Sequence, residues 1–261
     1  MPKLTVLTEN TAGGRFLAEH GLSYLIEMDG HTILFDTGSS DVFLRNASKM
    51  NIDLQKSVDQ IVLSHGHWDH GDGLRFIEKK PLLTHPAAFM KRFRKTDGTP
   101  VGLSLDHDTL SKKFDLHTTA KPFQISKHLF FLGEIPRKNN FESQTTSFCD
   151  ENGNDDFVPD DSALALIVND QLVVISGCSH SGICNICEYA KQVTGINAID
   201  TVIGGFHLKH NNEQTGKTIR YFEQEKVNRI IPSHCTELPA LAAFHLKFNT
   251  AQLKTGQQIR F

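Results

Sequence analysis

Short runs of aliphatic and β-branched residues alternate with polar, glycine-containing segments along most of the chain. Runs of this length and composition predict strands. In the first half of the chain they lie at 4–7, 24–27, 32–36, 58–63 and 82–85. Asp29-Gly30 predicts a hairpin turn between the second and third runs. Two helices are predicted here, one capped by Ser39 or Ser40 and ending near Met50, and a short one at 74–79.

The second half has the same order of strand pair, helix, strand and helix, without a visible repeat of the residues themselves. Its predicted strands lie at 123–126, 129–132, 163–168, 172–176, 201–203 and 227–231. Its predicted helices lie at 181–193, 213–225 and 238–248. The pattern predicts an α/β fold of two similar halves, each a sheet with helices outside it, so that the sheets face each other.

A less regular stretch at 86–122 lies between the two halves. Its basic run at 91–95 is interpreted as the solvated face of a helix, with a rim that attracts an anionic substrate as the alternative. The polar segment at 136–161 is too long for a simple turn, which indicates a lid, an insertion or a disordered loop. We therefore expect one domain over 1–261, with a lid or insertion around 86–161.

The composition is that of an ordinary globular protein, because 39% of the 261 residues are hydrophobic and 22% are charged. A net charge of −3 gives no reason to expect a nucleic-acid partner. No apolar run is long enough to cross a bilayer, and the chain begins without the apolar core of a signal peptide. Its five cysteines do not make an even disulfide framework. These features predict a cytoplasmic protein with reduced thiols and no membrane partner.

The candidate chemistry is concentrated directly after the predicted strand at 58–63. The order His65-x-His67-x-Asp69-His70 supplies imidazole and carboxylate groups, which suit Zn²⁺ and similar divalent ions. In an extended backbone His65 and His67 point to the same side. Asp69 and His70, at the turn into the next element, then aim at a second point. One short segment can thus begin two adjacent metal sites, as two-metal hydrolysis requires.

Three later histidines have the same context, since each follows a predicted strand and lies within two positions of a small residue. They are His180, His207 and His234. In open α/β folds ligands collect at the carboxyl ends of strands, so these three are interpreted as metal ligands or active-site residues. The others are interpreted as ordinary surface or core residues: His20, His31, His85, His107, His117, His128, His210 and His245.

Together with Asp36 at the end of the strand at 32–36, these motifs resemble the metallo-β-lactamase superfamily over nearly the whole chain. Finer motifs are similar to the branch related to the dihydropterin–aminobenzene ribofuranosyl phosphate synthase of methanopterin biosynthesis. These motifs are Glu19-His20-Gly21-Leu22-Ser23, Ser64-His65-Gly66-His67-Trp68-Asp69-His70, Gly177-Cys178-Ser179-His180-Ser181-Gly182-Ile183, Gly204-Gly205-Phe206-His207-Leu208 and Ser233-His234-Cys235-Thr236. The resemblance implies a four-layer αββα sandwich of two mixed sheets, with a dinuclear metal site along one edge.

The resemblance also implies roles for single residues. The ligands of a first metal ion match His65, His67 and His180, and those of a second match Asp69, His70 and His234. Asp36 matches a buried aspartate that orients the ligand loop. The cofactors implied are two divalent ions, for which Zn²⁺ is favoured and Mn²⁺ or Fe²⁺ are alternatives.

Cys178 departs from the superfamily pattern, because many members have a bridging aspartate at this point. Either its thiolate bridges or approaches the metal ions, or Cys178 is a small buried residue that supports the turn. Cys184 and Cys187 form a C-x-x-C pair inside a predicted helix. Packing is the favoured interpretation of that pair, with redox or zinc chemistry as the alternative.

Paired divalent ions can activate water and polarise a carbonyl or phosphoryl oxygen. Asp69 can also take the water proton, and His207, which has no position among the six ligands, is predicted to hydrogen-bond the substrate or leaving group. We expect a metal-dependent hydrolase acting on an ester, phosphoester or related bond in a small anionic molecule. The alternative is a transferase that joins a dihydropterin-methyl diphosphate to an aminobenzoate-type amine. A third hypothesis is a non-catalytic metal-binding protein.

Overall fold

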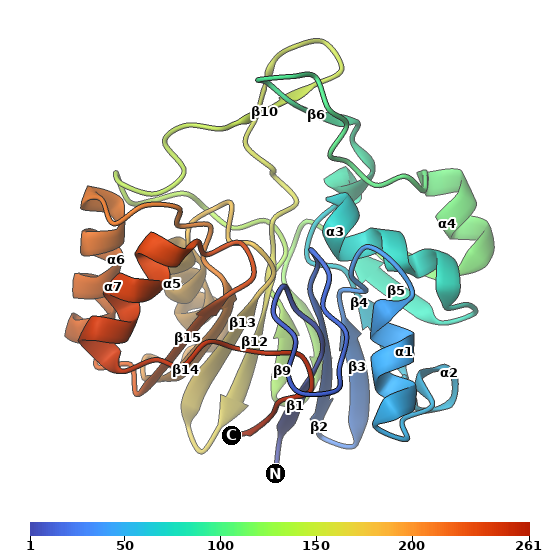
Figure 1. The fold of residues 1–261 in the computed structure, drawn as a ribbon, viewed down its shortest axis with the longest axis horizontal. Helices are drawn as coiled ribbons and strands as arrows, with labels where there is room; N and C mark the ends of the chain where they lie inside the picture. Colours follow the sequence, from blue (N-terminus) through green and yellow to red (C-terminus); the bar gives the residue numbers. More distant parts are fainter. The chain divides into compact units, whose positions relative to one another are not determined.

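The computed structural model describes residues 1–261, and the chain divides into two compact units. The first unit comprises Met1–Ala120, Thr146–Asp160 and Lys254–Phe261, and the second comprises Lys121–Thr145 and Asp161–Leu253. Each unit has one main sheet with helices packed on one of its faces (Figure 1). None of the helices combines the length and the apolar character that crossing a membrane requires.

Seven strands form the main sheet of the first unit: β1 (Lys3–Thr8), β2 (Ser23–Met28), β3 (His31–Phe35), β4 (Gln60–Val62), β5 (Pro81–Thr84), β7 (Asp115–Thr118) and β16 (Gln258–Arg260). Their order is β16-β1-β2-β3-β4-β5-β7. The pairs from β16 to β3 are antiparallel, and those from β3 to β7 are parallel. Asp29 and Gly30 form the predicted hairpin turn between β2 and β3, both with positive φ.

The helices of the first unit are α1 (Val42–Lys49), α2 (Leu54–Ser57), α3 (Trp68–Gly71), α4 (His107–Lys113) and the 3-10 helices η1 (Asp72–Phe76) and η2 (Pro86–Phe89). Helices α1 and α4 lie on the same face of the sheet (Figure 1), where Phe43 and Leu110 share a core with Leu34, Ile61 and Leu82. Each fully buried side chain of this size contributes roughly 1.5–3 kcal/mol of hydrophobic free energy.

The helix predicted at 74–79 is confirmed only over 74–76, because helical structure begins earlier, inside the histidine motif, and ends at Phe76. His67 still has an extended backbone, α3 starts at Trp68, and the 3-10 helix η1 ends at Phe76. The chain packs closely here, since a Cβ added at Gly73 would lie 2.1 Å from the carbonyl oxygen of Thr37. Asp69 and His70 are carried by a helix rather than by a loop.

A three-stranded sheet also belongs to the first unit and contains β6 (Arg92–Arg94), β10 (Phe148–Asp150) and β11 (Asp155–Asp156). The interpretation of the basic run at 91–95 as a solvated helix is wrong, since this run forms β6 and Arg92 is only 1% exposed. Buried carboxylates are the physical reason, because the Nε atom of Arg92 donates to Asp156 at 2.7 Å. The stretch 86–161 therefore contains ordered strands.

Six strands form the sheet of the second unit: β8 (Phe123–Ser126), β9 (Leu129–Phe131), β12 (Ala163–Val168), β13 (Gln171–Ser176), β14 (Ile199–Gly205) and β15 (Arg229–Ser233). Their order is β15-β14-β13-β12-β9-β8. Strands β13, β14 and β15 are parallel, so their carboxyl ends meet at one edge of this sheet.

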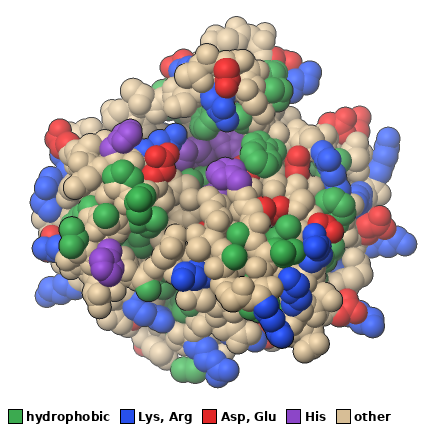
Figure 2. Space-filling model, in the orientation of Figure 1, with side chains coloured by type: hydrophobic (Ala, Val, Ile, Leu, Met, Phe, Trp, Pro, Cys, Tyr) green, Lys and Arg blue, Asp and Glu red, His purple; other side chains and the backbone are tan.

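Three helices pack on one face of this sheet (Figure 1): α5 (Ile183–Thr194), α6 (Glu213–Gln224) and α7 (Leu238–Phe248). Their apolar faces bury Ile186, Phe222 and Phe244 against Val174 and Val202 of the sheet. All three helices were predicted from the apolar periodicity, and the predicted mixed α/β class is confirmed. Acidic and basic side chains are interspersed over the face drawn in Figure 2, in keeping with a net charge of −3.

Candidate metal centre

One group of candidate ligands lies where β4 leads into α3 in the first unit. His65, His67 and His70 are buried, and Asp69 is 7% exposed. The Nε2 atom of His65 lies 3.0 Å from the Nδ1 atom of His67. Two nitrogen ligands of one tetrahedral zinc ion lie about 3.3 Å apart, because each Zn–N bond is about 2.0–2.1 Å long. The two imidazoles therefore fit a shared divalent ion.

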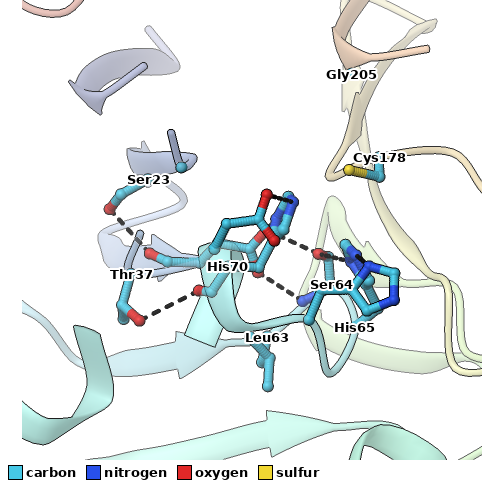
Figure 3. Close-up of polar contacts among 12 residues, drawn as sticks. Ser23, Thr37, Leu63, Ser64, His65, His70, Cys178 and Gly205 are labelled. Carbon is cyan, nitrogen blue, oxygen red and sulfur yellow. Dashed lines mark hydrogen bonds and ion pairs between the residues drawn. The ribbon is translucent and has the colours of Figure 1, made fainter. Parts of the chain in front are cut away.

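Asp36, directly after β3, holds this group in place through hydrogen bonds. Its backbone is left-handed, with φ 57°, and its carboxylate is completely buried. The N–H and the hydroxyl of Ser64 both donate to it at 2.7 Å, and its Oδ2 atom lies 2.7 Å from the Nδ1 atom of His70 (Figure 3). A proton held on Nδ1 leaves the lone pair of His70 on Nε2, so the ring is oriented for metal binding through that atom.

A second buried carboxylate, Asp160, holds the backbone between His65 and His67. It accepts the N–H of Gly66 at 2.7 Å, and the guanidinium of Arg92 donates to both of its oxygens. Burial raises the pKa of Asp160, against the opposing effect of Arg92. Gly66 itself is required, because a Cβ there would lie 1.8 Å from the carbonyl oxygen of Ala88. Two carboxylates thus fix the ligand segment.

Asp69 faces a histidine that the sequence did not single out. The Nε2 atom of His20 lies 3.2 Å from the Oδ2 atom of Asp69, and the side chain of His20 is 58% exposed. Its ring also lies 5.6 Å from the ring of Trp68. Nothing in the local pattern around His20 indicates this contact, although His20 belongs to one of the motifs shared with the synthase branch.

A separate group of candidate residues lies at the carboxyl ends of β13, β14 and β15 in the second unit. His180 follows β13, His207 follows β14 and His234 follows β15. The rings of His180 and His207 have their centroids 4.3 Å apart. His207 and His234 have left-handed backbones with φ 50° and 51°, a conformation that costs about 1–3 kcal/mol and persists only where the surroundings enforce it.

Hydrogen bonds between these loops provide that enforcement. The hydroxyl of Ser179 donates to the carbonyl oxygen of Gly205 at 2.6 Å. The hydroxyl oxygen of Thr236 accepts the N–H of Phe206 at 3.0 Å. The three histidines are therefore positioned by contacts among loops that are distant in sequence.

Two buried acids anchor the chain that follows His180. Asp161 accepts the N–H of Ser181 at 2.9 Å and its hydroxyl at 2.5 Å. Glu142 accepts the N–H groups of Cys184 and Asn185, both at 2.9 Å, at the first turn of α5. A carboxylate at this end of a helix satisfies amides that have no partner within the helix. Burial nevertheless raises the pKa of Glu142.

Cys178 lies in the second unit beside another cysteine, Cys235. The thiol of Cys235 donates to the carbonyl oxygen of Cys178 at 3.4 Å. Although burial raises it, the pKa of Cys235 is held well below its ordinary value by hydrogen bonds to Cys178 and His207. Cys235 was given no role from the sequence, although it belongs to one of the motifs shared with the synthase branch.

The C-x-x-C pair has a structural explanation. Cys184 and Cys187 are buried in the core beneath α5, and burial raises the pKa of both thiols. A thiol with a raised pKa is a poor nucleophile and a poor metal ligand at neutral pH. The packing interpretation of this pair is confirmed.

Comparison with known proteins defines the class of the chain. The family model described as the metallo-beta-lactamase superfamily matches residues 18–81. Two proteins of Methanocaldococcus jannaschii are each 34% identical to this chain over nearly their whole length. The chain therefore belongs to the metallo-β-lactamase superfamily, whose fold implies that it binds divalent metal ions.

Its relatives narrow this class further. One M. jannaschii relative is 7,8-dihydropterin-6-methyl-4-(β-D-ribofuranosyl)-aminobenzene-5'-phosphate synthase, with 99% of this chain and 96% of that protein covered. The other, MJ0448, is matched over 91% of this chain and 92% of its own length. The crystal structure of Tm1679, a metal-dependent hydrolase of the beta-lactamase superfamily, has a TM-score of 0.88 at 29% identity and covers 100% of this chain and 99% of its own. A diphosphatase of the PhnP family has a TM-score of 0.58 at 16% identity, covers 100% of this chain and 98% of its own, and shares the fold.

Proposed function

We propose that the chain is a metal-dependent hydrolase that cleaves an ester, phosphoester or related bond in a small anionic molecule. The observation that carries the proposal is the buried imidazole pair His65 and His67, with His70 oriented beside it by Asp36. Imidazoles with a fixed tautomer are the ligands that a hydrolytic divalent ion needs. The similarity to Tm1679, itself called a metal-dependent hydrolase, supports the same class.

The proposed ligand assignment follows the motif of the superfamily. One ion is bound by His65, His67 and His180, and the other by Asp69, His70 and His234. Zn²⁺ is the proposed metal, with Mn²⁺ and Fe²⁺ as alternatives. Bound ions of this kind supply an acidified water and polarise the oxygen of the scissile group.

The side chains of the protein carry the proton and hold the substrate in this proposal. Oδ2 of Asp69 receives a proton from the attacking water. His20, 3.2 Å from that oxygen and largely exposed, passes the proton to solvent. His207 hydrogen-bonds the substrate or leaving group. Its Nδ1 atom is buried and has no hydrogen-bond partner in the protein, which supports a role toward something bound.

A transferase is the second candidate, and the printed name of the 34% identical M. jannaschii relative favours it. In such a reaction the nitrogen of an aromatic amine would attack a dihydropterin-methyl carbon. The carbon–oxygen bond to diphosphate would break, and the amine would lose one proton to a base such as Asp69. The two candidates thus differ in whether water or an amine is the nucleophile.

Product analysis separates the two candidates. Metal-free protein is reconstituted with Zn²⁺, Mn²⁺ or Fe²⁺ and given phosphoesters, thioesters, lactones, or dihydropterin-methyl diphosphate with and without an aminobenzoate. A hydrolase releases the alcohol or the phosphate from at least one substrate without any amine. A transferase releases diphosphate and forms a carbon–nitrogen bond only when the amine is present. Full metal occupancy with no turnover in any assay would leave a non-catalytic metal-binding protein.

A pair of histidine variants provides the control for this experiment. His65→Ala removes one of the proposed ligands, so it lowers both the metal content and turnover. His31→Ala changes an exposed histidine on β3 and leaves both unchanged. Equal activity in the two variants would contradict the proposed ligand role of His65.

A further inference from the structure

A cavity of about 540 Å³ lies in the second unit, between α5, α6 and the segment 136–141. Its volume is within the range of about 300–1,000 Å³ that is usual for small-molecule sites. None of its lining residues is a candidate metal ligand, so the cavity is not part of the proposed metal centre. We propose that it binds a small aromatic anion, in which a flat ring carries a carboxylate or phosphate group.

Aromatic side chains line the cavity from three different elements. Phe141 belongs to the segment 136–141, Tyr189 to α5 and Tyr221 to α6. Each ring packs partly against the core beneath these helices and remains partly accessible. Aromatic rings prefer offset-stacked or edge-to-face contacts with other rings, so this lining favours a flat aromatic ligand over a flexible aliphatic chain.

Four of the lining side chains carry a charge: Lys138, Lys217, Arg220 and Glu188. The one acid, Glu188, is already engaged, because its Oε1 atom accepts from Lys191 at 2.8 Å and from the hydroxyl of Tyr221 at 2.7 Å. Lys217 is engaged as well, by Glu213 at 2.9 Å. The charges of Glu188 and Lys217 are therefore compensated by neighbours within the protein.

Lys138 and Arg220 are the two cations of the lining without an acidic partner. The Nζ atom of Lys138 donates to the neutral amide of Gln192 at 3.1 Å. The guanidinium of Arg220, exposed on α6, makes no hydrogen bond or ion pair within the protein. A guanidinium has five N–H donors in a planar fork that matches a carboxylate or a phosphate. These two side chains thus give the cavity the charge that an oxyanion needs.

The asparagines of the lining are already used by the protein itself. Oδ1 of Asn185 accepts the N–H groups of Lys138 and Asn139 at 3.0 and 3.1 Å, and its Nδ2 atom donates to Ser181. Asn139 in turn accepts the N–H of Glu142 at 2.8 Å and donates to its carboxylate at 2.6 Å. These bonds hold the segment 136–141 against α5, so this wall is formed before a ligand binds. The donors left for a ligand are chiefly cationic, which favours an anion over a neutral polar molecule.

Two probes of the same shape test the proposal on the full chain. 2-Naphthoate has a flat ring with one carboxylate, and 2-naphthamide is its neutral counterpart. In isothermal titration calorimetry 2-naphthoate is expected to bind at one site per chain, about tenfold more tightly than 2-naphthamide, because charge-assisted hydrogen bonds are the stronger ones. Naphthalene-2-phosphonate, titrated in the same way, distinguishes a phosphate from a carboxylate as the preferred group. Equal affinity for the amide and both anions, or no saturable binding of either anion, would overturn the proposal.

Arg220→Gln places the anion within the cavity. It is expected to weaken the binding of 2-naphthoate about tenfold and to leave that of 2-naphthamide unchanged. The matched control is Arg45→Gln, which changes an exposed arginine on α1 of the first unit and keeps the affinity for both probes. Circular dichroism checks that both variants are folded. An unchanged affinity in Arg220→Gln, or an equal loss in Arg45→Gln, would overturn the proposal.

His65→Ala separates this cavity from the proposed metal centre, since a carboxylate can also bind to metal ions. The variant lacks one proposed ligand of that centre and is expected to keep the full affinity for 2-naphthoate. Loss of binding in His65→Ala would mean that the probe binds at the metal ions, and would overturn the proposal. Binding in the cavity requires no turnover, so it can be established even where the proposed hydrolase activity fails.

Phe141→Leu tests the aromatic part of the proposal. Leucine keeps an apolar side chain at the cavity but removes one ring. The affinities for 2-naphthoate and 2-naphthamide are both expected to fall, by a similar factor of about two to ten. Unchanged affinities in this variant would contradict the assignment of a ring-bearing ligand.

Discussion

The two units hold their candidate ligands in opposite ways. In the first unit four candidate ligands come from the six residues 65–70, and the buried carboxylates of Asp36 and Asp160 fix that segment through hydrogen bonds. In the second unit the candidates come from three loops at the ends of parallel strands, and loop-to-loop hydrogen bonds and left-handed backbones position them. The candidate ligands of the first unit thus lie in one short segment held by distant residues, whereas those of the second unit lie on three separate loops.

This difference changes what a mutation can do. A contiguous ligand segment depends on a few buried charged supports, so the loss of one support should have a large effect. A set of ligands distributed over three loops depends on close packing at the strand ends, so each single change should cost less. Substitutions in each unit, compared with matched controls, test this contrast.

The largest effect is expected for Arg92→Met in the first unit. This change leaves the buried carboxylates of Asp156 and Asp160 without their cation. Breaking a buried ion pair from one side costs about 3–5 kcal/mol. We expect the free energy of unfolding, measured with urea, to fall by that amount and the metal content to fall with it.

The control for this prediction is Arg94→Met on the same strand. Arg94 pairs with Asp97 at 3.1 Å, but both side chains are about half exposed. Exposed pairs of this kind contribute about 0–1 kcal/mol. Similar losses in the two variants would show that β6 as a whole, rather than the buried pair, supports the ligand segment.

Asp36→Asn is expected to act on metal binding more than on stability. The amide can still accept the N–H of Ser64, but its NH₂ group cannot accept the hydrogen bond from Nδ1–H of His70. Losing such a support lowers metal affinity about 10–100-fold. Competition with a chromophoric chelator measures this change. Asp59→Asn, which alters an exposed acceptor of the Thr32 N–H, should leave the affinity unchanged.

In the second unit, Gly205→Ala is expected to cost about 1–3 kcal/mol, the usual result of forcing a methyl group into a packed space. The added Cβ would lie 2.5 Å from the carbonyl oxygen of Gly177 and 2.6 Å from the Sγ atom of Cys235. Gly216→Ala on α6 is the control. Its Cβ meets only Arg220 at 3.5 Å, and alanine favours a helix, so this variant should be slightly more stable. Thermal unfolding that ranks the two variants in the reverse order would contradict the packing argument.

The same contrast explains how far the sequence predicted the structure. The motif at 65–70 and the three later histidines were found because strand ends and glycines mark them locally. The helices of the second unit followed from apolar periodicity. Asp36 was expected from the resemblance, but the other supports were missed because their partners are far apart in sequence: Arg92 and Asp160 are separated by 68 positions, and Glu142 meets Cys184 across 42. No local pattern shows that a charged residue will be buried.

The start of α3 was missed for a related reason. The segment around α3 packs against a distant part of the chain, since Gly73 is in close contact with Thr37. The sequence shows that Gly73 is small, but not what packs against it. Arg92 is comparable: a run of basic residues usually faces solvent, and here buried carboxylates outweighed that tendency.

The smallest predicted effect concerns pH and the anchor of α5. Burial raises the pKa of Glu142 above its ordinary value of 4.5, so the folded chain binds this proton more tightly than the unfolded chain does. The free energy of unfolding therefore falls as pH rises from 4.5 through the raised pKa, by at most about 1.4 kcal/mol per pH unit for one proton.

Glu142→Gln should remove that slope, and its single carbonyl oxygen can still accept one of the two N–H groups, that of Cys184 or that of Asn185. Urea unfolding at several pH values between 4.5 and neutrality measures it as the difference between the variant and the wild-type chain. Glu213→Gln on α6 is the control, because the pH dependence of stability has the opposite sign at this residue. A hydrogen bond from Lys217 lowers the pKa of Glu213, so the small contribution of Glu213 to the free energy of unfolding is lost as pH falls. A Glu142→Gln variant with the wild-type slope would mean that the carboxylate stays ionised at the helix end, and that the amides of α5 outweigh its burial.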